Sequence, residues 1–327
     1  MKRLARPSLL ALLALVFALA LSACGGDEEP APQQAGGQDQ PAAPTQLKSD
    51  PANAQKGTIT VGSKNFTEQY VLGEIYAQTL EALGFKVKKR LNLGSEQIAY
   101  KALKAGQIDA YPEYTGTALT SFFDVKIDDV PRDPDQAYEQ AKAEYAKENI
   151  TALPRTPFEN TYRISSTIET AGKLGNPKTL SELVPKTSAL SISGFPECRQ
   201  RTDCLLGFKQ VYDYKGKFVS SEGKFNDLDK GTSDLTFAFS TDPQLALTDK
   251  YVGYDDDKKL FPPYNISFGV RNETLEKIGP EAREAILTVQ KGLTEEAMRE
   301  LNRRVELEKQ KPEEVAAAYL RESGFIQ

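Results

Sequence analysis

The sequence predicts two α/β lobes that are joined by two crossing segments, with a ligand cleft between them. Two series of alternating strand-like and helix-like stretches support this prediction, the first over residues 58–114 and the second over residues 189–239. A third observation is a pair of proline-containing segments, residues 154–158 and 261–264, where we expect the chain to pass between lobes. Alternation of this kind gives parallel sheets with right-handed crossovers. A cleft between two such lobes favours a small ligand.

The N-terminal residues have the pattern of an export signal. Lys2 and Arg3 precede an apolar run over residues 9–21, and small residues follow before Cys24. The run is too short to span a bilayer as a permanent helix. The Leu-Ser-Ala-Cys ending resembles a bacterial lipobox, in which the cysteine is acylated. We therefore expect a lipoprotein signal peptide over residues 1–23 and a lipid on Cys24 that anchors the protein to the cell membrane, outside the cytoplasm. A plain secretory signal is the alternative.

Residues 24–57 are predicted to form a disordered tether. They are rich in Gly, Pro, Gln, Ala and Asp and contain almost no large apolar residue. Such a composition cannot bury enough surface to offset the entropy lost on ordering. The folded part is expected to begin near Thr58.

The first lobe is predicted from residues 58–157 together with residues 265–327. Residues 58–62 alternate and are β-branched, which is typical of a strand, and a helical pattern follows until Gly84. The other elements expected here are strands over residues 85–88 and 108–114 and helices over residues 95–105, 135–149, 273–278, 281–291, 294–308 and 312–321.

The second lobe is predicted from residues 158–264. Its expected elements are strands over residues 160–164, 189–193, 217–220 and 235–239 and helices over residues 205–212 and 225–230. Residues 266–270 follow the second proline-containing segment, and we interpret them as the return crossing.

The stretch over residues 108–117 is the first candidate for a ligand site. It is predicted to be a buried strand that breaks at Pro112 and leads into a helix start at Thr115. The rings of Tyr111 and Tyr114 offer a negative π-face to a cation that cannot donate hydrogen bonds. The free N–H groups of a helix start suit an anion. A site with both halves suits a zwitterion, and the alternative is a core strand with ordinary aromatic packing.

The composition excludes several classes of function. The chain of 327 residues contains no histidine and only three cysteines. It therefore lacks a zinc site of the usual kind and a Ser-His-Asp or Cys-His pair. The formal net charge of -5, without a basic stripe, disfavours nucleic acid as a partner. We expect neither a metal nor another cofactor, and a monomer.

Cys198 and Cys204 are expected to form a disulfide. With Cys24 modified by lipid, these two cysteines remain as an even pair in an exported chain. A redox-active pair is disfavoured, because the spacing is not Cys-x-x-Cys.

Five short segments occur in a recognisable order. They are SKNFTEQ (63–69), YPEYTGT (111–117), NTY (160–162), STD (240–242) and FPPY (261–264). Together they resemble the osmoprotectant family of substrate-binding proteins, which deliver glycine betaine, carnitine, choline or related compounds to ABC importers. The resemblance implies a type II periplasmic-binding-protein fold, a quaternary-ammonium ligand clamped between the lobes, and the importer's permease subunits as partners.

The resemblance also implies roles for individual residues. The ligand's trimethylammonium group would lie in a box of tyrosines formed by Tyr114, Tyr162 and Tyr264, with Tyr111 nearby. A ligand carboxylate would meet Lys64, Thr117 and one arginine of the second lobe, Arg201 or Arg199. Ser240 stands where some relatives have another aromatic residue, so one wall of the box is missing or supplied elsewhere.

Two alternative functions remain. An amino-acid or polyamine receptor of the same fold would need acidic acceptors for ammonium N–H groups, and Asp109 and Asp242 are the candidates. A hydrolase could use Asp242 and Glu113 as paired carboxylates. Neither a glycine-rich phosphate loop nor a metal-ligand cluster supports the hydrolase, so we expect a receptor and not an enzyme.

Overall fold

The computed structural model describes residues 46–327. The predicted signal peptide, the lipidation site at Cys24 and the first part of the predicted tether lie outside this range. Within it, no helix has the length and apolar character needed to cross a membrane.

Residues 46–57, which the composition assigns to the tether, contact the first lobe. The backbone N–H of Leu47 donates to the carbonyl of Phe325 (2.8 Å). The side-chain amide of Asn53 donates to the carbonyl of Leu83 (2.8 Å). The described body therefore begins earlier than the composition predicts.

The first lobe contains a five-stranded sheet. Its strands are β1 (Thr58–Gly62), β2 (Lys86–Arg90), β3 (Ala110–Tyr114), β4 (Ile150–Ala152) and β10 (Ile266–Arg271), in the order β2-β1-β3-β10-β4. β1 is parallel to β2 and β3, whereas β10 is antiparallel to β3 and β4. Residues 266–270, expected as the return crossing, are therefore a strand inside the first sheet, and that interpretation was wrong.

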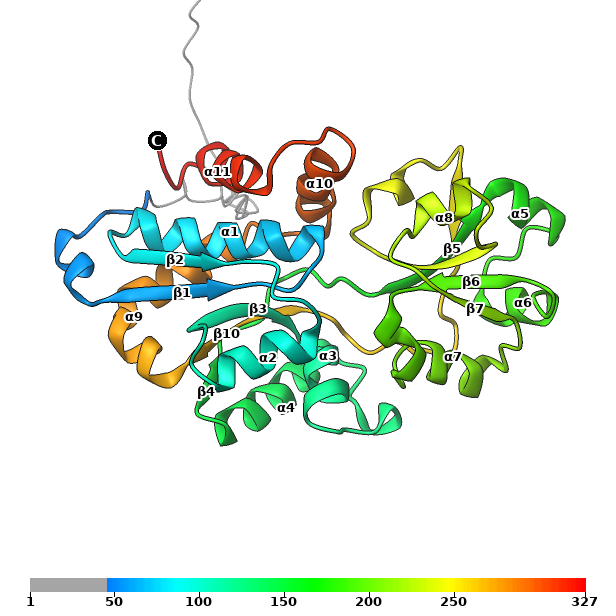
Figure 1. The fold of residues 1–327 in the computed structure, drawn as a ribbon, viewed down its shortest axis with the longest axis horizontal. Helices are drawn as coiled ribbons and strands as arrows, with labels where there is room; N and C mark the ends of the chain where they lie inside the picture. The colour runs from blue at the N-terminus through cyan, green and yellow to red at the C-terminus, as the bar shows by residue number, and fades with distance from the viewer. Residues whose placement is uncertain (1–45) are drawn as a thin grey trace, which may run out of the picture. The chain divides into compact units, whose positions relative to one another are not determined.

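The helices of the first lobe cover both faces of this sheet (Figure 1). They are α1 (Thr67–Ala82), α2 (Glu96–Lys104), α4 (Pro134–Lys147), α9 (Asn272–Gln290), α10 (Glu295–Glu306) and α11 (Pro312–Glu322), besides the single turn α3 (Thr115–Thr117). α11 packs along α1. The predicted break between two C-terminal helices corresponds to a kink inside α9, where Gly279 has a φ of 80° and precedes Pro280.

The second lobe contains another five-stranded sheet. Its strands are β5 (Tyr162–Thr167), β6 (Ser191–Gly194), β7 (Lys217–Ser220), β8 (Leu235–Phe239) and β9 (Tyr251–Gly253), in the order β7-β6-β8-β5-β9. Its helices are α5 (Ile168–Lys173), α6 (Leu180–Leu183), α7 (Leu205–Tyr212) and α8 (Phe225–Asp229). β6 is parallel to β7 and β8, while β5 is antiparallel to β8.

Pro112 does not break β3, contrary to the prediction. It lies opposite Phe268 of β10. On either side, the N–H of Arg271 donates to the carbonyl of Asp109 (3.0 Å), and the N–H of Thr115 donates to the carbonyl of Asn265 (3.0 Å), the residue before β10. Successive residues of a strand direct their backbone N–H and C=O groups to opposite neighbouring strands. The nitrogen of Pro112 therefore points away from β10, toward β1. β1 pairs with β3 only at Ala110, so no ladder hydrogen bond is lost at the proline.

The two crossing segments run side by side. Glu159 and Asn265 form an isolated antiparallel bridge, and the N–H of Asn160 donates to the carbonyl of Tyr264 (3.1 Å). The side chain of Asn265 donates to the carbonyl of Phe158 (2.9 Å). The crossings therefore hold Asn160 and Tyr264 next to each other between the lobes.

Candidate ligand-binding site

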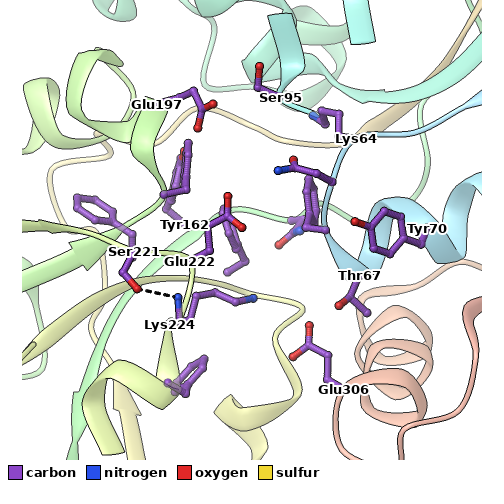
Figure 2. A pocket seen from close by; sticks show the side chains of 18 of the residues that line it. Lys64, Thr67, Tyr70, Ser95, Tyr162, Glu197, Ser221, Glu222, Lys224 and Glu306 are labelled. Atoms are coloured by element: carbon purple, nitrogen blue, oxygen red, sulfur yellow. Dashed lines mark hydrogen bonds between the residues drawn. The ribbon is translucent and has the colours of Figure 1, made fainter. Parts of the chain in front are cut away.

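A cavity of about 600 Å³ lies between the two lobes. Its volume falls in the range of roughly 300–1,000 Å³ that is typical of small-molecule sites. The lining includes residues that follow β1, β6 and β7, residues at the ends of β3 and β8, and residues from both crossings. Figure 2 shows Lys64 and Tyr70 on the first lobe's side and Tyr162 and Glu222 on the second lobe's side. The carboxyl ends of the parallel strands thus face the cavity, as in other open α/β sheets.

Six of the aromatic side chains of the lining lie next to one another, and we call these six the aromatic wall: Phe66, Tyr114, Tyr162, Phe195, Phe239 and Tyr264. Tyr162 lies at its centre, with ring centroids 5.1 Å from Phe239, 5.5 Å from Tyr264 and 6.4 Å from Phe195. Phe66 bridges the lobes, because its ring stacks on Tyr114 at 6.1 Å and on Phe239 at 6.4 Å. The fold therefore brings Tyr114, Tyr162 and Tyr264 together, as the resemblance implies.

Lys64 is a buried cation at the edge of the aromatic wall. Its ammonium forms an ion pair with Glu113 and lies 4.4 Å from the ring centroid of Tyr114. Burial lowers the pKa of Lys64, and the Glu113 carboxylate opposes that shift without cancelling it. A lysine has three N–H donors. One of them serves Glu113, so two remain for a ligand.

Arg201 lines the cavity and connects the two lobes. Its guanidinium donates to Asp203 through Nε (2.8 Å) and Nη2 (2.5 Å), and it also donates to Glu96 (3.3 Å) and to the hydroxyl of Thr117 (3.3 Å) of the first lobe. Asp203 accepts a further bond from the phenol of Tyr264 (2.8 Å). Burial raises the pKa of Asp203, but the Arg201 charge and the hydrogen bonds from Arg201, Tyr264 and Thr120 together outweigh it and hold this pKa below its usual value.

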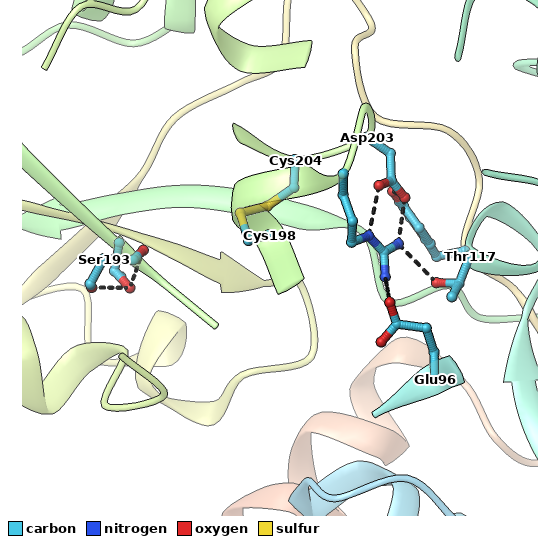
Figure 3. The surroundings of a disulfide bond; sticks show 9 residues. Glu96, Thr117, Ser193, Cys198, Asp203 and Cys204 are labelled. Atoms are coloured by element: carbon cyan, nitrogen blue, oxygen red, sulfur yellow. Dashed lines mark hydrogen bonds and ion pairs between the residues drawn. A yellow bond between two sulfur atoms is a disulfide. The ribbon is translucent and has the colours of Figure 1, made fainter. Parts of the chain in front are cut away.

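The disulfide between Cys198 and Cys204 is present in the structure. The loop that it closes carries Arg201 and also Asp203, which is labelled in Figure 3 beside the disulfide. In the chain-entropy model, closing so short a loop contributes about 2 kcal/mol to stability. The bond therefore limits the conformations available to the two charged residues of the second lobe that face the first.

The comparisons with known proteins agree with this geometry. A family model described as the substrate-binding domain of an ABC-type glycine betaine transport system matches residues 57–322. The chain belongs to this family. Proteins of this family are the binding components of transporters, so the chain is a receptor and not an enzyme.

Individual relatives resemble almost all of the folded chain. A glycine-betaine-binding protein of Pseudomonas aeruginosa is 31% identical over 290 residues, which cover 84% of this chain and 90% of that protein. The ergothioneine transport permease/ergothioneine binding protein EgtU of Helicobacter pylori is 30% identical over 285 residues, which cover 84% of this chain. The match includes 49% of the Helicobacter protein, so the chain spans about half the length of that relative.

Solved structures of the family share the fold. A crystal structure described as a glycine betaine/carnitine/choline ABC transporter superposes with a TM-score of 0.66 at 25% identity and covers 82% of this chain and 100% of that one. Apo YehZ from Escherichia coli superposes with a TM-score of 0.62 at 26% identity and covers 82% and 99% of the two chains. The predicted two-lobed periplasmic-binding fold is thereby confirmed.

Two residues that the resemblance places at the site lie outside the cavity lining. Tyr111 is fully buried in the first lobe, and its hydroxyl donates to Glu113 (3.0 Å). Arg199 is exposed, and its guanidinium carbon lies 5.3 Å from the ring centroid of Phe218. Of the two candidate arginines, only Arg201 lines the cavity.

Asp242 also lies outside the lining. It is buried, forms an ion pair with Lys224 and accepts a hydrogen bond from the N–H of Phe239 (2.9 Å). Lys224 does line the cavity, with its ammonium 5.5 Å from the ring centroid of Phe239. The structure thus gives Asp242 the role of a counter-charge for Lys224.

Phe195 and Phe239 of the aromatic wall were not predicted from the sequence, whereas Phe66 was expected at the edge of the sheet where the ligand binds. Phe195 directly follows β6 and Phe239 ends β8, so an aromatic residue at the end of two neighbouring strands was the available signal. Phe239 supplies an aromatic ring next to position 240, where this chain has a serine and some relatives have an aromatic residue. The hydroxyl of Ser240 instead accepts a bond from the N–H of Thr161 (3.2 Å) in the first crossing.

Proposed function

We propose that the protein is an extracytoplasmic receptor for a quaternary-ammonium osmoprotectant of the glycine betaine, choline or carnitine type. It holds the solute between its lobes, delivers it to the permease subunits of an ABC importer, and works as a monomer from a lipid anchor on Cys24. The aromatic wall is the observation that carries the proposal. Its six rings offer π-faces to a cation without N–H groups.

The aromatic wall supplies enough energy for the cation half of the ligand. A cation–π contact is worth about 1 kcal/mol when exposed and about 2 kcal/mol when desolvated. Three or four such contacts, with the methyl groups buried in the closed cleft, approach the roughly 8 kcal/mol that micromolar affinity requires.

Lys64, Thr117 and Arg201 are proposed to meet a ligand carboxylate. All three line the cavity. Four of the five N–H donors of Arg201 form hydrogen bonds with Asp203, Glu96 and Thr117. Together with the two free donors of Lys64, its last donor would bind a carboxylate only modestly, so the cation half carries most of the affinity.

A receptor for amino acids or polyamines is the second candidate. The acceptors first considered for it are engaged elsewhere: Asp242 pairs with Lys224, and Asp109 accepts from the N–H of Thr60 (2.7 Å). One observation favours this candidate: Glu197 and Glu222 line the cavity and form no ion pair among the described residues. Their carboxylates could therefore accept hydrogen bonds from a ligand's ammonium group.

A calorimetric titration tests the proposal. The folded receptor is titrated with glycine betaine, choline, carnitine, ergothioneine, arginine and spermidine. We expect a trimethylammonium compound to bind, and we expect Phe239→Leu to weaken it at least about fivefold, because leucine keeps the apolar contact but loses the π-face.

Phe239→Tyr is the matched control, since it retains the ring, and it should bind within about twofold of the unmodified protein. Binding of arginine or spermidine alone would overturn the proposal in favour of the second candidate. Equal trimethylammonium binding by the leucine and tyrosine variants would show that the aromatic wall does not recognise the cation.

A further inference from the structure

Glu68 is a buried carboxylate directly behind the aromatic wall. It lies in the first turn of α1 and is 2% exposed. Its Oε1 accepts hydrogen bonds from the phenol of Tyr114 (2.7 Å) and the amide of Asn160 (2.9 Å). Its Oε2 accepts from the hydroxyl of Thr241 (2.5 Å) and the amide of Asn302 (3.0 Å). These four donors belong to the first lobe's sheet, the first crossing, the second lobe and α10.

The hydrogen bonds of Glu68 favour its charged form. An ionised carboxylate only accepts hydrogen bonds, and the two asparagine amides direct N–H groups at it. Both asparagines do so although their own Oδ1 atoms then find no partner among the described residues. Each buried oxygen without a hydrogen bond costs free energy. The orientation of the two amides therefore favours an ionised carboxylate at Glu68.

Glu68 forms no direct ion pair within the described residues, although its charge interacts with that of Lys224, which is itself paired with Asp242. Burial raises the pKa of Glu68, and its hydrogen bonds oppose that shift. A buried carboxylate without a direct ion pair attracts a cation that enters the adjoining cavity.

Tyr114 connects this charge to the cavity. Its hydroxyl contacts Glu68, and its ring lines the cavity. A phenol that donates to a carboxylate has a more electron-rich ring, and the charge behind the ring adds a direct attraction in a site that excludes water. The Lys64 ammonium, which is paired with Glu113, also lies 4.4 Å from this ring centroid.

We propose that Glu68 is a positioning residue that supplies a fixed negative charge behind Tyr114 and thereby makes the cavity prefer a cation over a neutral molecule of the same shape. The inference rests on the proposed function and deepens it, because it names the residue that sets charge selectivity. A purely structural Glu68, which only links four elements, would not affect that selectivity.

The test compares ligand pairs that differ only in carbon for nitrogen: choline with 3,3-dimethylbutanol, or glycine betaine with 3,3-dimethylbutanoate if the receptor prefers a zwitterion. The quantity measured is the ratio of the two affinities. We expect Glu68→Gln to lower this ratio about tenfold while the affinity for the carbon analogue changes little. Thermal unfolding of the variant shows separately whether the fold is retained.

Tyr114→Phe provides a second variant that keeps the ring. It removes only the hydroxyl that contacts Glu68, so it should lower the ratio in the same direction, and the double variant should lower it by less than the product of the two single effects. Tyr319→Phe is the matched control, because it removes another buried phenol, bonded to the carbonyl of Val289 (2.7 Å), outside the cavity. The control should leave the ratio unchanged.

The outcomes separate this inference from the proposed function. If the unmodified receptor prefers the cation and Glu68→Gln keeps that preference, the inference is overturned and the proposed function stands. If both affinities fall equally in the glutamine variant, Glu68 has a structural role only, and the inference is again overturned. If the unmodified receptor binds no quaternary-ammonium compound, the proposed function fails and the inference falls with it.

Discussion

Replacing Arg201 by methionine is expected to lower the free energy of unfolding by about 3 to 5 kcal/mol, because it leaves a buried charge without its partner. Asp203 is fully buried and depends on the guanidinium for two of its hydrogen bonds. Within residues 46–327, the hydroxyls of Tyr264 and Thr120 would remain as its donors. Urea denaturation followed by circular dichroism measures the change.

The same pair predicts how stability depends on pH. The folded-state pKa of Asp203 lies below its ordinary value of 3.8. Its contribution is therefore present above the unfolded-state pKa and is lost as the pH falls through the folded-state pKa. Asp203→Leu combined with Arg201→Met removes both charges, so it should recover part of the loss and flatten this acid dependence.

Arg163→Met is the matched control for the arginine. Its partner Asp255 is 74% exposed, and exposed pairs contribute less than about 1 kcal/mol. Equal losses in the two arginine variants would contradict the assignment of Arg201 and Asp203 as a strongly coupled buried pair.

The order of elements was predictable because its signals are local. β1, β7, β8 and α7 begin and end where alternation, helical periodicity and turn residues place them. The role of β10 was not predictable in this way, because nothing within residues 266–271 indicates which strand they will pair with. Pairing with β3 and β4 depends on the whole lobe, as does the side to which the nitrogen of Pro112 points.

In the candidate site too, the residues that belong to local motifs were predictable, and those that depend on distant contacts were not. Tyr114, Tyr162 and Tyr264 come from motifs, and the fold does bring them together. Arg199 and Arg201 could not be distinguished, because both lie in the disulfide loop and only their environments differ. Glu68 lies inside the SKNFTEQ motif, but its proposed role depends on a hydrogen bond from Tyr114, which is 46 positions away in the sequence. Such a contact is visible only in three dimensions.

The affinity for a quaternary-ammonium compound is expected to rise with pH through the ionisation of Glu68. The folded-state pKa of Glu68 lies above its ordinary value of 4.5, chiefly because of burial. If the charge of Glu68 strengthens binding about tenfold, protonation should weaken binding by the same factor. By linkage, the bound cation lowers the pKa of Glu68 by about one unit. Choline titrations at pH values from 4.5 upward measure this dependence.

The free protein should show the opposite trend. A carboxyl group whose folded-state pKa is raised contributes stability at pH values below its unfolded-state pKa and loses it as the pH rises through the folded-state pKa. Glu68 should therefore reduce the stability of the empty receptor over the range in which it strengthens binding. Glu68→Gln should remove both trends, so the difference between the two proteins isolates this one group from the other carboxylates of the cavity.

Proton release provides a direct check on this coupling. Tyr114 contacts Glu68 and the charge of Lys224 interacts with it, and both groups have raised pKa values, so neither changes protonation between pH 4.5 and neutrality. Near the pKa of Glu68, choline binding should release protons, detected as a binding enthalpy that depends on the ionisation enthalpy of the buffer. A release that is the same in Glu68→Gln would assign the protons to other groups and would contradict the coupling. A release that disappears in Glu68→Gln would assign the protons to Glu68, as the coupling requires, because a bound cation favours the ionised form of this carboxyl group.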